Sequence, residues 1–252
     1  MPERFFIDAT ATTSTGVVLR GPLASHLARS LRLRAGDRIV VVDRDGREHG
    51  VLLRSVAPER VAGDVAWSRP ASGEPRLRIT VLQALPRERM EDCVDALVQA
   101  GAAAVRPMLS ERVVSRPSNH RLPQRVQRWQ AIATESAQLA GRGMIPLVHP
   151  PVALPDALAA LDGGARLLAC TFAAERSIAD VDVDAGRPLA VCIGPEGGLG
   201  ERDLDTLHRA GAAAVHMGPR VLRTRYAGAV ACAVLLARAG ELAEPLTPAP
   251  WR

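Results

Sequence analysis

Short apolar runs separated by polar residues dominate the first part of the chain. They predict five strands over residues 5–7, 16–20, 37–42, 48–56 and 61–67, with one short helix over residues 22–31. Asp45-Gly46 lies between two apolar runs and is a strong signal for a tight hairpin turn. Residues 1–69 are therefore expected to form a small, barrel-like β domain.

From residue 77 the pattern changes to apolar runs that alternate with segments of helical periodicity. Buried strands are predicted over residues 77–85, 103–109, 167–171, 188–193 and 213–217. Helices are predicted over residues 87–100, 121–140 and 224–239, with one more between the last two strands, and residues 172–183 read as polar and partly helical. This alternation is typical of an α/β domain, which we place at residues 77–243.

Proline, glycine and serine mark the borders of that domain. Residues 70–76, PASGEPR, are predicted to be the linker between the two domains. Residues 244–252 are rich in proline and are expected to form a loose C-terminal tail.

Two features of the predicted helices concern packing. The segments QAGAAAV at 99–105 and RAGAAAV at 209–215 each put a glycine between a helix and a strand, which predicts a left-handed C-terminal cap. The alternative interpretation is that the similarity of the two segments arose by gene duplication. The last helix carries a face of small residues, Ala227, Gly228, Ala229, Ala231 and Ala233, which would permit close packing against a neighbour.

Composition bounds the class of protein. The chain has 252 residues, of which 47% are hydrophobic and 23% charged, as in ordinary globular proteins with one large or two modest domains. No apolar run reaches the roughly 18 to 20 residues of a membrane helix. The N-terminus lacks a signal-peptide core, so we expect a cytoplasmic protein with no membrane partner.

The net charge of +5 comes from a chain without lysine, so all 32 basic residues are arginine. A basic balance suits a polyanionic partner, although charge alone does not decide for nucleic acid. Arginines of the β domain, Arg4, Arg20, Arg29, Arg32 and Arg34, either form a solvated surface or contact RNA phosphates.

The four cysteines, Cys93, Cys170, Cys192 and Cys232, are widely spaced and fit neither a zinc site nor a disulfide framework. They are interpreted as reduced core residues, with a nucleophilic cysteine as the alternative. No metal is expected.

Two glycine-bearing turns each follow an apolar run. Gly194-Pro195-Glu196-Gly197-Gly198 follows Ile193, and Gly218-Pro219-Arg220 follows Met217. In open α/β sheets a ligand lies beyond the carboxyl ends of the strands, where glycine lets the backbone approach it. We expect the two turns to lie on neighbouring strands at one sheet edge and to form a cofactor pocket.

Other common sites have no support. The first turn lacks the Lys-Ser/Thr ending of a phosphate-binding P-loop and the spaced glycines of a dinucleotide fingerprint. The chain also lacks the motifs of zinc hydrolases and serine esterases.

The strings Ile193-Gly194-Pro195-Glu196-Gly197-Gly198 and Met217 to Thr224, MGPRVLRT, resemble the two cofactor motifs of the RsmE family. These are S-adenosylmethionine-dependent methyltransferases of the SPOUT superfamily that modify N3 of a uridine in 16S ribosomal RNA. The resemblance covers nearly the whole chain, including residues 26–37 in the first domain and Ser110-Glu111-Arg112 and residues 128–142 in the second.

The resemblance implies a SPOUT-type α/β domain with a C-terminal trefoil knot, preceded by a small PUA-like β-barrel domain. It also implies a homodimer that binds S-adenosylmethionine and acts on 16S rRNA or the small ribosomal subunit. The cofactor residues carried over from the family motifs are Thr171, Ile193, Gly194, Pro195, Glu196, Gly197, Gly198, Met217, Gly218, Val221, Leu222 and Thr224.

Methylation at N3 requires loss of the N3 proton, which leaves negative charge on the uridine ring. Arg223 is our candidate to stabilise that charge, and the alternative is an ion pair with Glu196 or a contact with the end of a helix. Glu196 either has a role in the cofactor site or is a carboxylate favoured at a helix N-terminus by the helix dipole. The candidate RNA-binding residues are Arg4, Arg29, Arg32, Arg34, Arg142 and Arg225.

The chain departs from the family at several positions. The family usually has an acidic residue where this chain has Arg225, and commonly a lysine at Ala96, while Gln99 and Gln138 replace glutamates. The cofactor glycines are intact. Two hypotheses follow: an active uridine-N3 methyltransferase, or a divergent relative that methylates another RNA or binds RNA without catalysis.

Overall fold

A computed structural model describes residues 3–8, 11–12, 16–114, 120–243, 245 and 250–251. The chain divides into two compact units, each described here by itself. Unit 1 comprises Met1–Glu74, Ala137–Ile145 and Leu246–Arg252, and unit 2 comprises Pro75–Ser136 and Pro146–Pro245. Each unit is therefore assembled from segments that are not contiguous in sequence.

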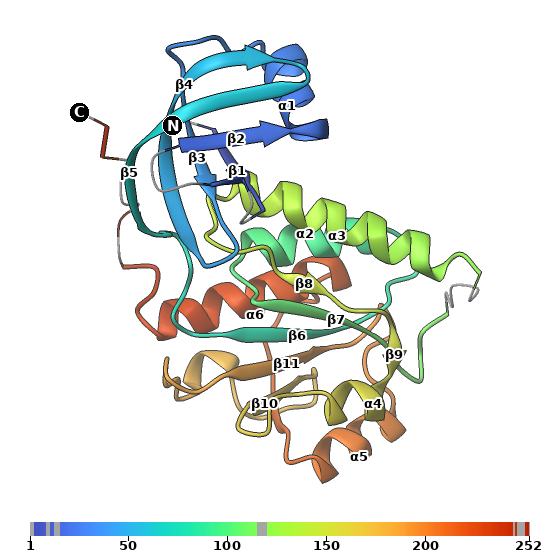
Figure 1. Cartoon of the computed structure of the whole chain (residues 1–252). Coiled ribbons are helices and arrows are strands. Elements are labelled where there is room, and N and C mark those ends of the chain that lie inside the picture. Colours follow the sequence, from blue (N-terminus) through green and yellow to red (C-terminus); the bar gives the residue numbers. More distant parts are fainter. Residues whose placement is uncertain are drawn as a thin grey trace. The chain divides into compact units, whose positions relative to one another are not determined.

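Unit 1 is built on a five-stranded sheet in the order β1-β3-β4-β5-β2. Its elements are β1 (Arg4–Phe6), β2 (Gly16–Arg20), α1 (Gly21–Ser25), the π-helical turn η2 (His26–Ser30), β3 (Arg38–Val42), β4 (Arg47–Ala57) and β5 (Arg60–Pro70). β1 runs parallel to β3 and the other pairs are antiparallel. The long β4–β5 hairpin forms one side of this unit (Figure 1).

The core of unit 1 follows from the alternation seen in the sequence. Phe5, Val17, Ile39 and Val51 point into one cluster, which Leu27 of η2 closes from the helical side. The predicted hairpin at Asp45-Gly46 is confirmed, because β3 and β4 pair around it and Gly46 has a φ of 71°. The predicted strands agree with the observed ones to within a few residues, and the predicted helix is divided into α1 and η2.

Most of the predicted loose tail, residues 244, 246–249 and 252, lies outside the described residues. Trp251 is described and belongs to unit 1. Its ring lies edge-on to Trp67 at 5.5 Å between centroids, and the Arg38 guanidinium lies 5.4 Å from its centroid. This end of the chain therefore packs against the sheet of unit 1.

Unit 2 is built on a parallel sheet in the order β12-β10-β11-β6-β7-β8, with β9 also paired to β7. Its elements are β6 (Ile79–Ala84), α2 (Met90–Gln99), β7 (Ala104–Leu109), α3 (Leu122–Leu139), β8 (Leu147–Val148), β9 (Val152–Ala153), α4 (Leu154–Ala159), β10 (Arg166–Cys170), η3 (Ile178–Asp180), β11 (Leu189–Ile193), α5 (Glu201–Arg209), β12 (Ala213–Val215) and α6 (Thr224–Arg238). Residues 137–139 at the end of α3 group with unit 1.

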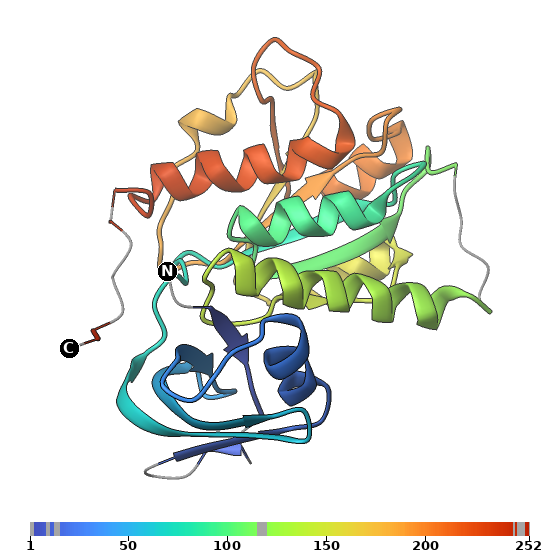
Figure 2. The ribbon, with the colours of Figure 1, turned by 90° about the horizontal axis from the view of Figure 1, so that it is seen from above.

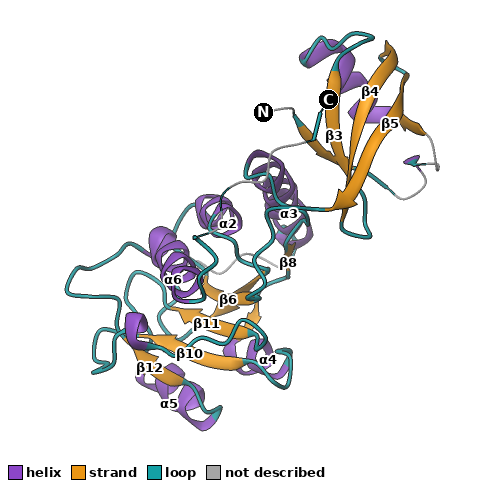
Figure 3. Cartoon of the chain, turned by 90° about the vertical axis from the view of Figure 1, so that its left-hand side faces the viewer, coloured by secondary structure: helices purple, strands orange, loops and turns teal. Residues whose placement is uncertain are grey.

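Helices cover both faces of this sheet, with α2, α3 and α6 on one face and α4 and α5 on the other (Figures 2 and 3). Met90, Val94, Leu97 and Val98 of α2 are buried, as their shared face predicted. The small face of α6 packs closely, because a Cβ on Gly228 would lie 2.7 Å from the Leu97 side chain. No helix within the described ranges is long and apolar enough to span a membrane.

The two helix-to-strand turns are also confirmed. Gly101 follows α2 with a φ of 93°, and Gly211 follows α5 with a φ of 78°. These left-handed conformations favour glycine, since a Cβ there would crowd the following carbonyl. Each turn delivers the chain directly into the next parallel strand.

Three expectations need correction. β11 and β12 are not neighbours, because β10 lies between them and pairs with both. β12 is a short edge strand with an exposed Ala214, rather than a fully buried strand. The helix expected from residue 87 begins at Met90, because Arg89 has a left-handed conformation with a φ of 62° and ends the irregular segment before it.

Candidate cofactor pocket

The carboxyl ends of β10, β11 and β12 meet around one pocket, which the start of α6 completes. Its lining residues are Cys170, Thr171, Phe172, Ile193, Gly194, Pro195, Glu196, Gly198, Met217, Gly218, Arg220, Val221, Leu222, Arg223, Thr224 and Ala227. Both glycine turns thus reach the same pocket although their strands are not adjacent. The end of β10 fills the place between them.

All but one of the predicted cofactor residues line this pocket. The exception is Gly197, whose carbonyl accepts a hydrogen bond from Arg112 Nη1 at 2.8 Å. Four further residues line the pocket that the sequence motifs did not identify: Cys170, Phe172, Arg220 and Ala227. Phe172 and Ala227 had usable signals, since one follows a predicted strand directly and the other lies on the small face of the last helix.

Glycine is required at several positions of the pocket wall. A Cβ on Gly194 would lie 2.7 Å from the Leu199 nitrogen and 2.8 Å from the Gly198 carbonyl carbon. Gly198 and Gly218 have φ values of 71° and 85°, and no heavy atom lies within 4 Å of the position of an added Cβ. At Gly198 and Gly218 the backbone therefore borders open space, so that a bound ligand can approach it closely.

The first glycine turn is held from outside by the loop that follows β7. The Asp203 carboxylate accepts hydrogen bonds from the Gly200 nitrogen at 3.0 Å and from the Glu111 nitrogen at 3.1 Å. Glu111 Oε2 in turn accepts one from the Arg202 nitrogen at 3.1 Å. A Cβ on Gly200 would lie 2.2 Å from Glu111 Oε2, so the carboxylate occupies the space that glycine leaves. These contacts join the start of α5 to two loops.

Replacing Asp203 by alanine is expected to lower the free energy of unfolding by about 2 kcal/mol, because two backbone N–H groups lose their acceptor at a helix start. Urea unfolding followed by circular dichroism measures this change. Asp205→Ala on the same helix is the control, since Asp205 is exposed and should shift stability by less than about 0.5 kcal/mol. Equal midpoints for the two variants would contradict the proposed role of Asp203.

Arg223 and Glu196 lie at the rim of the pocket. Arg223 is exposed, precedes α6 and makes no ion pair with any other described residue, so the predicted alternative of a pair with Glu196 is not observed. Both Glu196 carboxylate oxygens lie 3.2 Å from the Arg87 nitrogen, which donates to them. The Arg223 guanidinium is therefore available to a ligand.

Arg225, where the family usually has an acidic residue, packs against α2. Its Nη1 lies 3.6 Å from Asp92 Oδ2, and its guanidinium lies 4.6 Å from the centroid of the Tyr226 ring. Ala96, the position where the family commonly has lysine, lines the same hollow as Arg225 and Asp92. The positive charge at residue 225 thus has its counter-ion on the neighbouring helix.

None of the four cysteines forms a disulfide. Burial raises the pKa of Cys93 to about 12, and burial together with the nearby Cys232 raises the pKa of Cys170 to about 12. Burial also raises the pKa of Cys192. Because a nucleophilic cysteine needs a lowered pKa, these raised pKa values argue against a nucleophile. Cys93, Cys192 and Cys232 are buried core residues, whereas Cys170 is half-buried and lines the cofactor pocket.

Apart from Arg225, the arginines predicted to contact RNA fall into two groups. Arg29, Arg32 and Arg34 are exposed on and after η2, and none of them forms an ion pair with another described residue. Arg32 has a φ of 54°, a conformation that is rare for residues other than glycine. This group remains compatible with phosphate contact.

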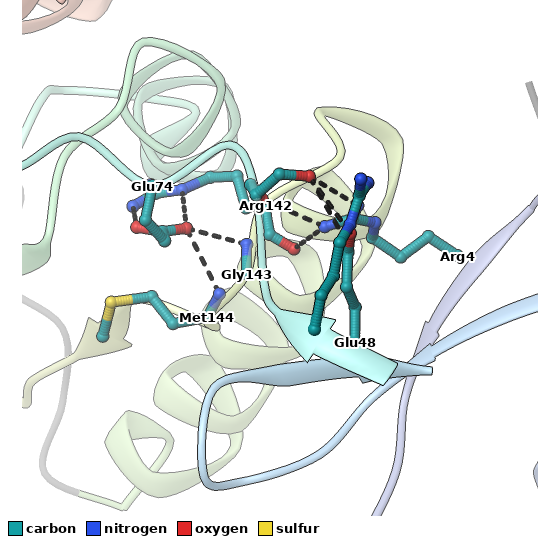
Figure 4. A network of polar contacts seen from close by, with 8 residues as sticks. Arg4, Glu48, Glu74, Arg142, Gly143 and Met144 are labelled. Carbon is teal, nitrogen blue, oxygen red and sulfur yellow. Dashed lines mark hydrogen bonds and ion pairs between the residues drawn. The ribbon is translucent and has the colours of Figure 1, made fainter. Parts of the chain in front are cut away.

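Arg4 and Arg142 are instead held inside unit 1 (Figure 4). Arg4 is paired with Glu48, a fully buried carboxylate that also pairs with Arg69. Arg4 Nη1 donates to the Arg142 carbonyl oxygen at 3.0 Å. Arg142 forms a bidentate ion pair with Glu74, with Nε 2.9 Å from Oε1 and Nη2 2.7 Å from Oε2. The Arg142 side chain is only 3% exposed.

Glu74 also accepts hydrogen bonds from the Gly143 and Met144 nitrogens, at 3.0 and 3.2 Å. Burial lowers the pKa of the Arg4 guanidinium. The network anchors residues 72–74 and 142–144, and it occupies both arginines. Arg4 and Arg142 are therefore engaged inside unit 1, which argues against the predicted contact of these two arginines with RNA.

Comparison with known proteins defines the class. Residues 73–236 match the RNA methyltransferase domain family, and residues 19–51 match the RNA methyltransferase PUA domain. The chain therefore combines an RNA methyltransferase domain with an RNA methyltransferase PUA domain.

The chain is 32% identical over 238 residues to ribosomal RNA small subunit methyltransferase E of Mycobacterium bovis, covering 90% of this chain and 88% of that protein. It is 25% identical to the Bacillus subtilis enzyme of the same name, covering 89% and 92%. The crystal structure of the Neisseria gonorrhoeae enzyme bound to S-adenosylmethionine is similar with a TM-score of 0.84 and 26% identity, covering 94% and 98%. The chain belongs to the ribosomal RNA small subunit methyltransferase E family.

Proposed function

We propose that this protein transfers a methyl group from S-adenosylmethionine to N3 of a uridine in the 16S RNA of the small ribosomal subunit. The observation that carries the proposal is the single pocket formed by both glycine turns and the end of β10. The relative from Neisseria gonorrhoeae, similar along most of the chain, binds S-adenosylmethionine.

The pocket residues fit this cofactor. Ile193, Met217 and Leu222 offer an apolar surface, and the open space beside Gly198 and Gly218 lets a ligand approach the backbone closely. The other residues proposed to contact it are Thr171, Gly194, Pro195, Glu196, Val221 and Thr224. When bound, S-adenosylmethionine supplies a methyl group activated by a positively charged sulfur.

Arg223 is proposed to stabilise the uridine ring after N3 has lost its proton. The deprotonated ring carries negative charge on N3 and the flanking carbonyl oxygens, and a positioned guanidinium lowers the cost of that charge in a site that excludes water. Arg223 suits the role because it lines the pocket and has no ion-pair partner within the described chain. Glu196, at the same rim, is proposed to orient the neighbouring segment through the Arg87 nitrogen.

The finer fold proposed for unit 2 is a C-terminal trefoil knot. β12 lies at the sheet edge, beyond β10, yet α6 packs back on β6 and β11 near the sheet centre. Residue His216 bridges Ser177 just before the chain returns. The chain thus passes the segment that follows β10 before it returns to the sheet centre as α6. This path supports the proposal that the C-terminal segment is threaded into a knot. We further propose a homodimer that acts in the cytoplasm, where ribosomal RNA is found.

Unit 1 is proposed to bind RNA through Arg29, Arg32 and Arg34, as a PUA-like domain with an exposed basic edge. The alternative function is a divergent relative that acts on another RNA or binds without catalysis. The observation that favours it is the contact of Arg225 with Asp92, which places a cation beside the pocket where the family usually has a carboxylate.

A methyl-transfer assay tests the proposed function. The purified protein is incubated with S-adenosylmethionine carrying a labelled methyl group and with small ribosomal subunits that lack N3-methyluridine, alongside free 16S RNA. Mass spectrometry of the digested RNA should find N3-methyluridine at one position. Label at another base, or in another RNA only, would favour the alternative, and absence of transfer despite cofactor binding would contradict the proposal.

A further inference from the structure

A second cavity adjoins the cofactor pocket on the side of α2. It encloses about 420 Å³ and is lined by Pro86, Arg87, Glu88, Arg89, Glu196, Arg223, Thr224 and Arg225. Glu196, Arg223 and Thr224 line both cavities. A volume of this size lies within the range of small-ligand sites, and four of its eight lining residues are arginines.

The segment before α2 supplies the outer wall of this arginine cavity. Because Arg89 has a left-handed backbone, α2 starts only at Met90, and residues 87–89 form an irregular loop. Conformations of this kind cost free energy for residues with a Cβ and gather at functional sites. The Glu196 carboxylate accepts a hydrogen bond from the Arg87 nitrogen and so fixes the loop to the glycine turn.

The four arginines differ in what neutralises them. Arg89 and Arg225 share the Asp92 carboxylate, at 3.3 and 3.6 Å. Arg87 and Arg223 make no ion pair with any residue that the structure describes. The cavity therefore presents two arginines without an ion pair: Arg223 at the wall shared with the cofactor pocket, and Arg87 on the loop before α2. The Glu88 and Glu196 carboxylates line the same cavity.

We propose that the arginine cavity receives the target nucleotide, with the base at the shared wall and its phosphate against Arg87. This inference rests on the proposed function. A base that accepts a methyl group must reach the boundary with the cofactor pocket, where Arg223 and Thr224 lie. A base is taken out of its stack to reach such a site. Its sugar and phosphate then extend toward the residues that line the arginine cavity alone, among which Arg87 is the cation without a counter-ion.

Arg87→Gln should therefore weaken RNA binding and leave the cofactor pocket unchanged. The probe is a fluorescent oligouridylate, titrated into the full-length protein by anisotropy at several salt concentrations. We expect about tenfold weaker binding at low salt, and a slope of log K against log salt that is smaller by about one, as for the loss of one phosphate contact. Arg87→Lys keeps the charge and should keep the slope.

Arg238→Gln is the matched control, since Arg238 is an exposed arginine in the last turn of α6 and lines neither cavity. It should bind oligouridylate as the wild-type protein does. With small subunits as substrate, Arg87→Gln should raise KM for the subunit and leave the affinity for S-adenosylmethionine unchanged.

The inference is overturned if Arg87→Gln binds oligouridylate with wild-type affinity and salt slope, or if its defect lies in S-adenosylmethionine affinity. Failure of the proposed function is distinguishable from these results. In that case the wild-type protein binds oligouridylate with an Arg87-dependent slope and transfers no methyl group to 16S RNA.

Discussion

Replacing Arg223 by alanine is expected to slow methyl transfer about 10²- to 10³-fold, the cost of removing one preorganised donor that stabilises developing negative charge. The affinity for S-adenosylmethionine should change little, because the walls formed by the glycine turns remain. Arg223 also precedes α6, but its side chain makes no capping hydrogen bond, so folding should be unaffected.

Single-turnover transfer to small subunits measures the rate, and calorimetry measures cofactor affinity. Arg223→Lys separates charge from geometry, because lysine keeps the charge and lacks the forked donors; it should regain only part of the rate. Since the ring must lose a proton, the residual rate of Arg223→Ala should also rise more steeply with pH than that of the wild type. Wild-type rates in Arg223→Ala would exclude this arginine as the stabilising group.

Replacing Gly194 by alanine is expected to weaken S-adenosylmethionine binding about 10- to 100-fold. The added Cβ would lie below 3 Å from backbone atoms of Gly198 and Leu199, and backbone cannot move aside as a side-chain tip can. The turn must open to relieve the clash, at a cost typical of overpacking, about 1 to 3 kcal/mol.

Gly197→Ala is the matched control in the same turn. Its nearest neighbours would be Arg112 side-chain carbons at 3.5 and 3.6 Å, which is ordinary contact, and its φ is not positive. Gly197→Ala should therefore bind the cofactor nearly as the wild type does. Calorimetry gives the affinities, and thermal unfolding shows whether either variant is destabilised as a whole. Similar affinities for the two variants would indicate that the turn adapts to a side chain.

The parts of the site that the sequence predicts are those set by local chemistry. Glycine directly after an apolar run identifies a strand end with an exposed backbone, and this holds for Gly194 and Gly218 wherever their strands lie in the sheet. The helical face of Met90, Val94 and Leu97 is likewise readable from its spacing. Such features need only neighbouring residues to be recognised.

The order of strands is different, because it depends on pairing between distant segments. The insertion of β10 between β11 and β12 brings Thr171 and Phe172 into the pocket, and no periodicity encodes that choice. Arg4 illustrates the same limit for charge. Its partners Glu48 and Arg142 are 44 and 138 positions away in sequence, so composition could not separate a buried pair from a surface cation.

The start of α2 shows a third limit. Residues 87–89 have helix-forming side chains, so propensity extends the helix to them. The helix instead starts at Met90 because Arg89 has a left-handed backbone and because the Arg87 nitrogen donates a hydrogen bond to Glu196. These two hydrogen-bonded residues are 109 positions apart in sequence. The loop that lines the arginine cavity is therefore a product of tertiary structure.

The close fit of the Glu111 carboxylate into the space beside Gly200 restricts which residues can replace either one, both in evolution and in protein engineering. A side chain at position 200 would displace the Glu111 carboxylate, and the Arg202 nitrogen would then lose its hydrogen-bond acceptor. The two positions are expected to covary among relatives. A library or a chimera that exchanges the glycine turn alone would separate co-adapted partners, so the β7 loop and the start of α5 must be exchanged with it as one block.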